Sequence, residues 1–509
     1  MIKKTALYLN MLMLSVPLVA AAEVPWPQCA AISAQDDQAL QAFYHPLNDQ
    51  PQWLQAGQRE RLAEALATLA DDGLNPDDYR LGSTAPQALD CAELTHSLAY
   101  WHAMQHLYFG RLPQELLEPI WQREPWDKPA AEAQLLRWAQ AFVQKPAQGF
   151  AKARPLSAQY AALRRVYAAE REQAYTAWPL VEPGALLKLG SRGARVTQLR
   201  ERLIASGHLT AEPVAEAELF DQTLADAVRQ VQREHALNPD ALVGSGTLQA
   251  LNLGPTQRRD QLRVNLERLR WLRHFFEPDL LLINVAAAEL HLYRDGQPVW
   301  HTRTQVGRAE RPTPLLKSRL SRLTLNPSWT IPPTILKKDK LPKIRADLAY
   351  LEQENLLVLD FDGKQLDPTS IDWARPGGIM LRQPPGPKNP LGHMALRFAN
   401  PFSVYLHDTP SQNLFAKAPR TFSSGCVRIE AVDTLSSLLL SEAELTRVQE
   451  LLAKGDTYEY RLAAGIPLLM AYWTVEVDGQ GHVTRYPDSY GHDAKILQAL
   501  LKADARSRI

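Results

Sequence analysis

Cysteine is scarce in this sequence, with three among 509 residues, and neither sign of charge is in excess. The 56 lysine and arginine residues balance 56 aspartate and glutamate residues, so nothing in the composition points to a nucleic-acid or anionic-membrane partner. Beyond the N-terminus no apolar run reaches the length of a membrane span. The hydrophobic content of 45% is ordinary for globular protein, and the length leaves room for about three domains.

The N-terminus has the one long apolar stretch, residues 6–19, behind Lys3 and Lys4 and ahead of Ala20-Ala21-Ala22. This order of basic, apolar and small residues is typical of a secretory signal peptide. We expect residues 1–22 to be cleaved on export, and no lipobox cysteine follows them. The mature chain is then expected to have no transmembrane segment.

Export makes the three cysteines informative, because oxidising compartments pair thiols. Cys29 and Cys91 both lie in the N-terminal region and are expected to form a disulfide. Cys426 is then left over, and an odd cysteine in an exported protein indicates a reactive thiol. The alternative, three buried thiols, stays open.

A histidine precedes this cysteine in a specific setting. The apolar run Val404-Tyr405-Leu406 predicts a strand that ends at His407, and Cys426 follows within Ser423-Ser424-Gly425-Cys426-Val427-Arg428. A cysteine nucleophile reacts as its thiolate and needs a base such as histidine. We expect Cys426 to lie just before a helix over residues 431–440, where the helix dipole would favour the thiolate.

The glycine of this string lets the backbone approach a ligand closely. We therefore expect the amides of Gly425 and Cys426 to stabilise an oxyanion. The string resembles the active site of the L,D-transpeptidase (YkuD) family of bacterial cell-wall enzymes, whose signature is a strand-borne histidine followed by Ser-x-Gly-Cys-x-Arg. That family often has glycine and histidine where this chain has Asp408 and Ser424. In these two departures the chain resembles the large YcbB-type branch of the family.

The resemblance implies a Cys426 nucleophile and a His407 base that the backbone carbonyl of Asp408 orients, so that the side chain at 408 is tolerated. Arg428 has a planar guanidinium that suits stem carboxylates, although a structural ion pair is an open alternative. Trp329 would be a groove wall or a core residue. The residues expected to bind substrate are Arg428, Ser424, Trp329 and Tyr405.

Changes of period and Pro/Gly-rich stretches divide the chain, and predict a multidomain α+β protein. After the signal peptide we expect an α-helical scaffold (23–183), a small three-helix domain that resembles a peptidoglycan-binding domain (184–255), a linking helix (256–277), a mainly β catalytic domain (278–465) with a helical lid insertion (about 333–378), and a C-terminal tail packing on scaffold or catalytic domain (466–509).

The linking helix is basic and amphipathic, and is expected to be a strut with its charged face in water. His102 and His106 stand four apart in a helical pattern, but lack a third metal ligand and are expected to be structural. His393, after a proline-rich loop, is also interpreted as structural. No metal or cofactor is expected.

The resemblance implies a periplasmic enzyme of peptidoglycan. Cys426 would attack the carbonyl of the L-centre of diaminopimelate in a tetrapeptide stem and release D-Ala, and the amine of a second stem would resolve the acyl-enzyme as a 3→3 cross-link. It further implies acylation by carbapenems, and makes other cell-wall synthesis enzymes candidate partners.

Two alternatives stay open. An L,D-carboxypeptidase or endopeptidase would use the same Cys-His pair with water as the acceptor. A non-catalytic wall-binding scaffold would not need the pair, and labelling of Cys426 by a thiol reagent at low pH is the expected discriminator.

Overall fold

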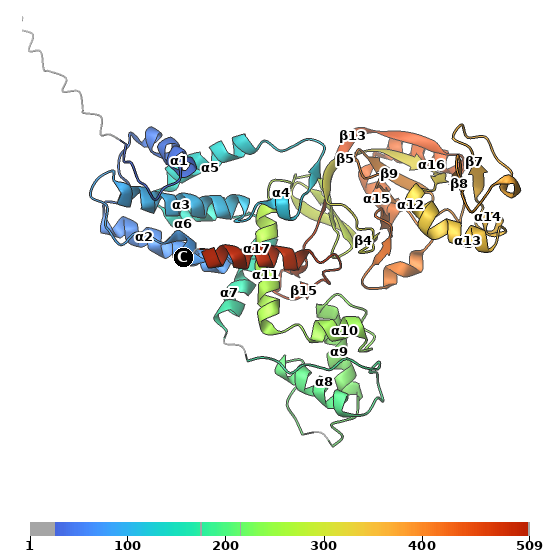
Figure 1. Ribbon diagram of the computed structural model, residues 1–509, viewed down its shortest axis with the longest axis horizontal. Helices are drawn as coiled ribbons and strands as arrows, with labels where there is room; N and C mark the ends of the chain where they lie inside the picture. Colours follow the sequence, from blue (N-terminus) through green and yellow to red (C-terminus); the bar gives the residue numbers. More distant parts are fainter. Residues whose placement is uncertain (1–25, 174–175, 214, 507–509) are drawn as a thin grey trace, which may run out of the picture.

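The computed structural model of the protein describes residues 26–173, 176–213 and 215–506. The expected signal peptide, residues 1–22, lies outside these ranges. Figure 1 shows helices α1 to α7 at one end of the molecule, a β domain at the other, and a small helical domain beside both. The expected multidomain α+β fold is confirmed. Within the described ranges, no helix combines the length and apolar character needed to cross a membrane.

The helical end is built around α3 (Cys91–Phe109), whose buried residues include Leu94, Tyr100 and Leu107. Trp53 packs against Tyr100 with ring centroids 5.9 Å apart. The other elements of this scaffold are α1 (Ala34–Tyr44), α2 (Ala56–Ala67), α4 (Gln114–Leu117), α5 (Lys128–Phe142), α6 (Pro146–Ala153), α7 (Ala158–Glu172) and the 3-10 turns η1 (His45–Leu47), η2 (Thr68–Asp72) and η3 (Pro76–Tyr79).

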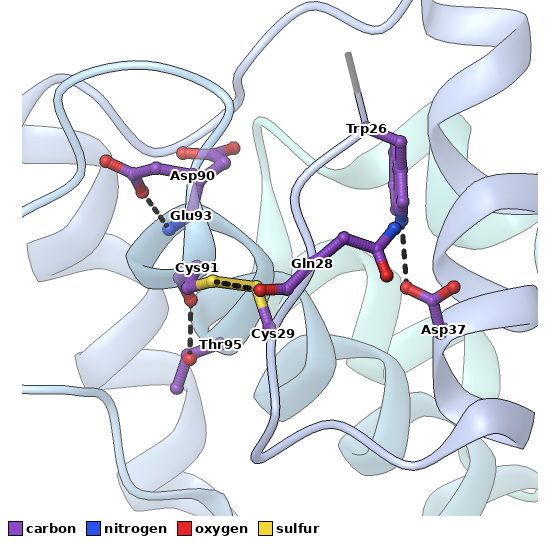
Figure 2. Close-up of a disulfide and its surroundings, with 8 residues drawn as sticks. All are labelled: Trp26, Gln28, Cys29, Asp37, Asp90, Cys91, Glu93 and Thr95. Carbon is purple, nitrogen blue, oxygen red and sulfur yellow. Dashed lines mark hydrogen bonds between the residues drawn. A yellow bond between two sulfur atoms is a disulfide. The ribbon is translucent and has the colours of Figure 1, made fainter.

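A disulfide joins Cys29 to Cys91, with Cα atoms 5.6 Å apart across a sequence separation of 62 residues. Figure 2 shows its surroundings at the start of α3, where the Asp90 carboxylate caps the helix by accepting from the Glu93 amide at 2.9 Å. The Thr95 hydroxyl donates to the Cys91 carbonyl at 2.7 Å. The bond thus ties the N-terminal segment to the central scaffold helix.

Replacing both cysteines, C29A/C91A, is expected to lower the free energy of unfolding by about 4 kcal/mol, because the unfolded chain regains the entropy of an open loop of this length. Urea denaturation of the exported protein against the double variant measures the difference. Alkylation of the native exported protein provides the check, since two reactive thiols at these positions would refute the pairing.

The small domain has the expected three helices, α8 (Ala194–Ala205), α9 (Gln222–Glu234) and α10 (Ser245–Leu251), around a core that includes Leu199 and Val228. Buried Gln232 organises the turn between α9 and α10. Its amide nitrogen donates to the Asp240 carboxylate (2.9 Å) and its oxygen accepts from the Ala241 amide (2.9 Å).

The linking helix α11 (Pro255–Leu272) differs from the expectation, because much of its charge is buried. Arg263 pairs with Asp504 at 2.7 Å, and Arg268 pairs with Glu118 at 3.1 Å. Asp504 lies on the last helix, α17 (His492–Arg506), which crosses α11 and packs against it (Figure 1). The charged face is therefore an internal seam that joins scaffold, strut and C-terminal helix, since Arg263 and Arg268 both find acidic partners in other segments.

The C-terminal half is dominated by a sheet that closes on itself, in the order β5-β13-β2-β3-β4-β12-β10-β9 and back to β5. The scaffold adds strand β1 (Trp121–Gln122) parallel to β5, and β11 (Thr421–Ser423) pairs with β4. The strands of the ring are β2 (Leu280–Asn284), β3 (Glu289–Arg294), β4 (Gln297–Gly307), β5 (Leu316–Leu325), β9 (Met394–Phe398), β10 (Leu406–His407), β12 (Val427–Ile429) and β13 (Tyr458–Ala471).

Strand β13 crosses the domain boundary expected at 465, because its last residues pair with both β2 and β5. The tail proper starts after Ala471. The remaining elements outside the insertion are the 3-10 turn η6 (Gln412–Ala416), the helices α15 (Val432–Leu439) and α16 (Glu442–Ala453), and the hairpin β14 (Val475–Val477) and β15 (Val483–Arg485).

The insertion forms its own small α/β unit, and the expectation of a helical lid is therefore incomplete. Strands β6 (Trp329–Thr330), β8 (Met380–Gln383) and β7 (Leu357–Leu359) make a separate sheet with a core that includes Ile331, Ile344 and Leu381. Strands of two to four residues are too short for an alternating pattern to indicate them. The helical elements are α12 (Pro333–Ile335), the π-helical turn η4 (Leu336–Lys340), α13 (Leu341–Ala346), α14 (Tyr350–Gln353) and the 3-10 turn η5 (Pro368–Ser370).

Candidate active site

Strand β10 lies between β9 and β12, and runs parallel to β12 with His407 opposite Arg428. Next to this pair, the backbone amide of Val427, the residue after Cys426, donates to the carbonyl of Tyr405 at 3.1 Å. Aligned residues of neighbouring strands share a face, and side chains alternate along each strand. One face of the sheet therefore carries the side chains of Tyr405, His407, Cys426 and Arg428. The strand register thus gathers residues that are distant in the sequence.

His407 is buried, and its Nδ1 lies 2.5 Å from the carbonyl oxygen of Asp408. A carbonyl only accepts, so Nδ1 is the donor and Nε2 carries the lone pair of the neutral ring. Burial lowers the pKa of His407 to about 3, and the guanidinium of Arg428 acts in the same direction. The ring is therefore neutral at physiological pH, with Nε2 available as a base.

Cys426 is the free cysteine of the described chain and is partly exposed. It precedes strand β12, and helix α15 begins only at Val432, so the expected position at a helix N-terminus is wrong. Burial raises the pKa of the thiol, although Arg397 and Arg428 oppose that rise. Rapid labelling at low pH is thus not expected of the free protein, because both the thiol of Cys426 and the imidazole of His407 are neutral at rest.

The turn before Cys426 is held by its own side chains. The Ser423 hydroxyl donates to the Cys426 carbonyl (2.5 Å), and the Gly425 amide donates to the Ser423 oxygen (3.1 Å). Thr313 fixes the turn from outside by donating its hydroxyl to the Gly425 carbonyl at 2.9 Å. Gly425 has φ +115°, a conformation that favours glycine. Its amide must exchange its present partner before it can serve an oxyanion.

Several arginines lie around Cys426. Arg428 donates to the Gln305 side chain at 3.0 Å, and burial lowers its pKa. Arg397 lies 3.9 Å from the centre of the Tyr405 ring. The amide of Arg308 donates to the Ser423 carbonyl at 3.1 Å. Only Arg428 was expected from the sequence, because the other arginines come from strands and loops outside the motif.

The side chain of Asp408 has a partner of its own, while the expectation that its identity is tolerated stays a prediction. The carboxylate lies 2.7 Å from the ring Nδ1 of His393 and accepts from the His393 amide at 3.1 Å. The Asp408 contact, together with Asp433 at 2.7 Å on the other ring nitrogen, raises the pKa of His393 to about 9. The clamp fixes the peptide whose carbonyl orients His407.

Trp329 lies on β6 and packs against the core of the insertion. The Lys340 ammonium sits 5.7 Å from the centre of its ring. Trp329 therefore belongs to the inserted unit, which begins earlier than the expected residue 333. His102 and His106 also have protein partners, since His102 contacts Asp36 at 2.9 Å and His106 contacts the Tyr79 hydroxyl at 2.8 Å.

Comparison with known proteins gives three family matches. Residues 278–449 match the model of the "L,D-transpeptidase catalytic domain" (YkuD), residues 38–166 match a "Scaffold domain", and residues 192–251 match a "Putative peptidoglycan binding domain". A protein of Haemophilus influenzae described as "Putative L,D-transpeptidase" is 34% identical over 249 residues, which are 48% of this chain and 50% of that protein. The chain thus spans half the length of this relative.

Solved structures of L,D-transpeptidases overlap more weakly. One from Mycobacterium smegmatis has 14% identity, covers 38% of this chain and 58% of its own, and has a TM-score of 0.18. One from Stackebrandtia nassauensis has 12% identity, covers 58% and 96%, and has a TM-score of 0.20. Overlaps this low carry no weight beside the family match. The family match covers both the histidine strand and the cysteine turn, and the chain accordingly carries, at residues 278–449, a catalytic domain of the L,D-transpeptidase (YkuD) family.

Proposed function

We propose that the protein is an exported, periplasmic L,D-transpeptidase that joins peptidoglycan stem peptides by 3→3 cross-links. The observation that carries this proposal is that a thiol and a neutral imidazole project from the same sheet face, in a domain that matches this family. The peptidoglycan-binding-type domain supports a cell-wall substrate.

In the first half-reaction the Cys426 sulfur attacks the carbonyl of the L-centre of diaminopimelate in a tetrapeptide stem, while Nε2 of His407 takes the thiol proton. His407 then gives this proton to the nitrogen of the departing D-Ala as the peptide bond breaks. A thioester between Cys426 and the tripeptide stem remains. The base is available because the Asp408 carbonyl holds the other ring nitrogen as a donor.

In the second half-reaction the side-chain amine of a second stem attacks the thioester carbonyl and loses its proton to His407. The Cys426 sulfur leaves and is reprotonated by His407, so that the enzyme returns to its starting state. The surrounding arginines suit stem peptides, which carry several carboxylates, because a guanidinium pairs with a carboxylate through two parallel hydrogen bonds.

Incubation of the purified protein with a disaccharide tetrapeptide, followed by mass spectrometry, tests the proposal. The expected products are a cross-linked dimer and one free D-Ala for each dimer. If tripeptide is the only product, the protein is instead an L,D-carboxypeptidase, with water as the acceptor. An unchanged substrate would favour the remaining alternative, a non-catalytic wall-binding scaffold.

The insertion is expected to favour the amine over water, because a lid that orients the acceptor can supply an effective molarity of about 10⁵ M or more and excludes solvent. Strands β6 and β8 pair directly, with the Ile331 amide bonded to the Leu381 carbonyl at 2.9 Å, so a short Gly-Ser link in place of residues 333–378 closes a hairpin. This variant is expected to shift products from dimer to tripeptide.

Alkylation of Cys426 at the wild-type rate is the control that the shortened protein keeps its catalytic domain. An unchanged ratio of dimer to tripeptide would contradict the lid role. The residues around Tyr405 would then have to enforce transfer to the amine.

A further inference from the structure

Arg311 connects the lid to the nucleophile turn. Its two terminal nitrogens bind the two carboxylate oxygens of Asp339 at 2.6 and 3.0 Å. One of these nitrogens also donates to the hydroxyl of Ser424 at 3.0 Å. Asp339 belongs to the π-helical turn η4 of the insertion, whereas Ser424 stands two residues before Cys426. A carboxylate in the position of the Asp339 side chain therefore lies beside the turn that carries the nucleophile.

The two partners differ in how firmly they are held. The backbone around Arg311 packs tightly on the closed sheet at Gly307, the last residue of β4. A Cβ atom added to Gly307 would meet the Arg311 carbonyl oxygen and the Thr313 amide. Thr313 in turn bonds to the nucleophile turn. Asp339 is carried by the separate lid unit, and its side chain is 36% exposed against 14% for Arg311. Asp339 is thus the partner that can be exchanged.

The site has the chemistry of a carboxylate receptor. The pair is bidentate and charge-assisted, which is the arrangement in which arginine binds planar carboxylates most strongly. The contact with Asp339 raises the pKa of Arg311 and lowers that of Asp339, so both groups are ionised at neutral pH. Beside it, the Lys340 ammonium donates to the Tyr350 hydroxyl at 2.8 Å, which is a contact within the inserted unit.

We propose that Arg311 binds a carboxylate of the donor stem peptide and that Asp339 occupies this position until the stem arrives. This rests on the proposed function for the identity of the substrate. The incoming carboxylate displaces Asp339 and takes over both hydrogen bonds of the guanidinium. The exchange releases the lid turn from the nucleophile loop, so donor binding and lid movement are coupled. Asp339 lowers donor affinity by the fraction of time that it occupies Arg311.

Binding of a tetrapeptide stem to the Cys426→Ala protein, measured by calorimetry, tests this without any turnover. In this background Asp339→Asn is expected to tighten the dissociation constant at least about 3-fold, because the competing charge is lost. Arg311→Gln is expected to weaken it at least about 10-fold. In the Arg311→Gln protein the added Asp339→Asn change should have no effect, since the carboxylate has lost its receptor.

Asp362→Asn is the matched control, because Asp362 is an exposed acid of the same insertion and its replacement should leave binding unchanged. A donor stem whose carboxylates are converted to amides should bind the wild-type, Asp339→Asn and Arg311→Gln sites equally. Equal binding of the free-acid stem by the Asp339→Asn and Asp339-containing proteins would overturn the proposal, as would failure of both to bind. The transpeptidase assignment fails separately, when the active wild-type enzyme forms no dimer.

Discussion

Replacement of Cys426 by alanine is expected to abolish the release of D-Ala and the formation of cross-linked dimer, to below detection. A methyl group cannot form the thioester, and no other cysteine of the chain is free, since Cys29 and Cys91 are bonded to each other. The turn should survive the change, because its bonds come from the Ser423 and Thr313 side chains and from backbone. Product analysis by mass spectrometry measures the loss.

The Cys426→Ser variant is the matched control for shape. It keeps the size of the side chain and supplies a hydroxyl, whose much higher pKa makes it a poorer nucleophile, so transfer should be lost in this variant too. Equal circular dichroism and equal urea midpoints of the three proteins would show that the chemistry and not the fold was removed. Turnover of Cys426→Ala at the wild-type rate would refute the role of this residue.

His407→Ala is expected to lower the rate of dimer formation by at least about 100-fold, which is the usual contribution of general acid-base catalysis. The neutral imidazole has to accept the thiol proton, because burial holds the pKa of Cys426 above that of an ordinary thiol. The rate of acyl-enzyme formation under single turnover is the measurement. A loss of less than 10-fold would mean that another group takes the proton.

The same residue ties stability to pH. The pKa of His407 in the folded protein, about 3, lies below the ordinary value near 6.5. Between these two pH values the imidazole is protonated in the unfolded chain and neutral in the folded one. His407 therefore contributes fully to stability above pH 6.5, and this contribution is lost as the pH falls from 6.5 towards 3. Wild type should lose more stability than His407→Ala between pH 7 and 5 in urea titrations. Equal losses would contradict the buried neutral ring.

Much of the site was predictable because its signal is local. The strand that ends at His407 follows from Val404-Tyr405-Leu406, and the cysteine stands in a short string of distinctive composition. The helix expected over residues 431–440 is present as α15, but strand β12 separates it from Cys426, and a strand of only three residues leaves no alternation that would predict it. The electrostatic expectation for the thiol was wrong for that reason.

Contacts between distant segments could not be predicted in the same way. The arginines of α11 looked like a solvated face because Glu118 and Asp504 are far away in the sequence. His393 looked structural because its partner Asp408 becomes a neighbour only when β9 pairs with β10. Arg311 gave no signal, because Asp339 comes from an inserted unit whose sheet is built of very short strands.

The most direct test of a cysteine acyl-enzyme is the intact mass of the protein, quenched in acid within the first turnover on a disaccharide tetrapeptide. The expected result is an added mass equal to the disaccharide tripeptide acyl group, located on the peptide that contains Cys426 and absent from Cys426→Ala. Addition of an acceptor amine should remove this mass and yield the dimer. Dimer formed without any adduct, or an adduct that persists in Cys426→Ala, would contradict the mechanism.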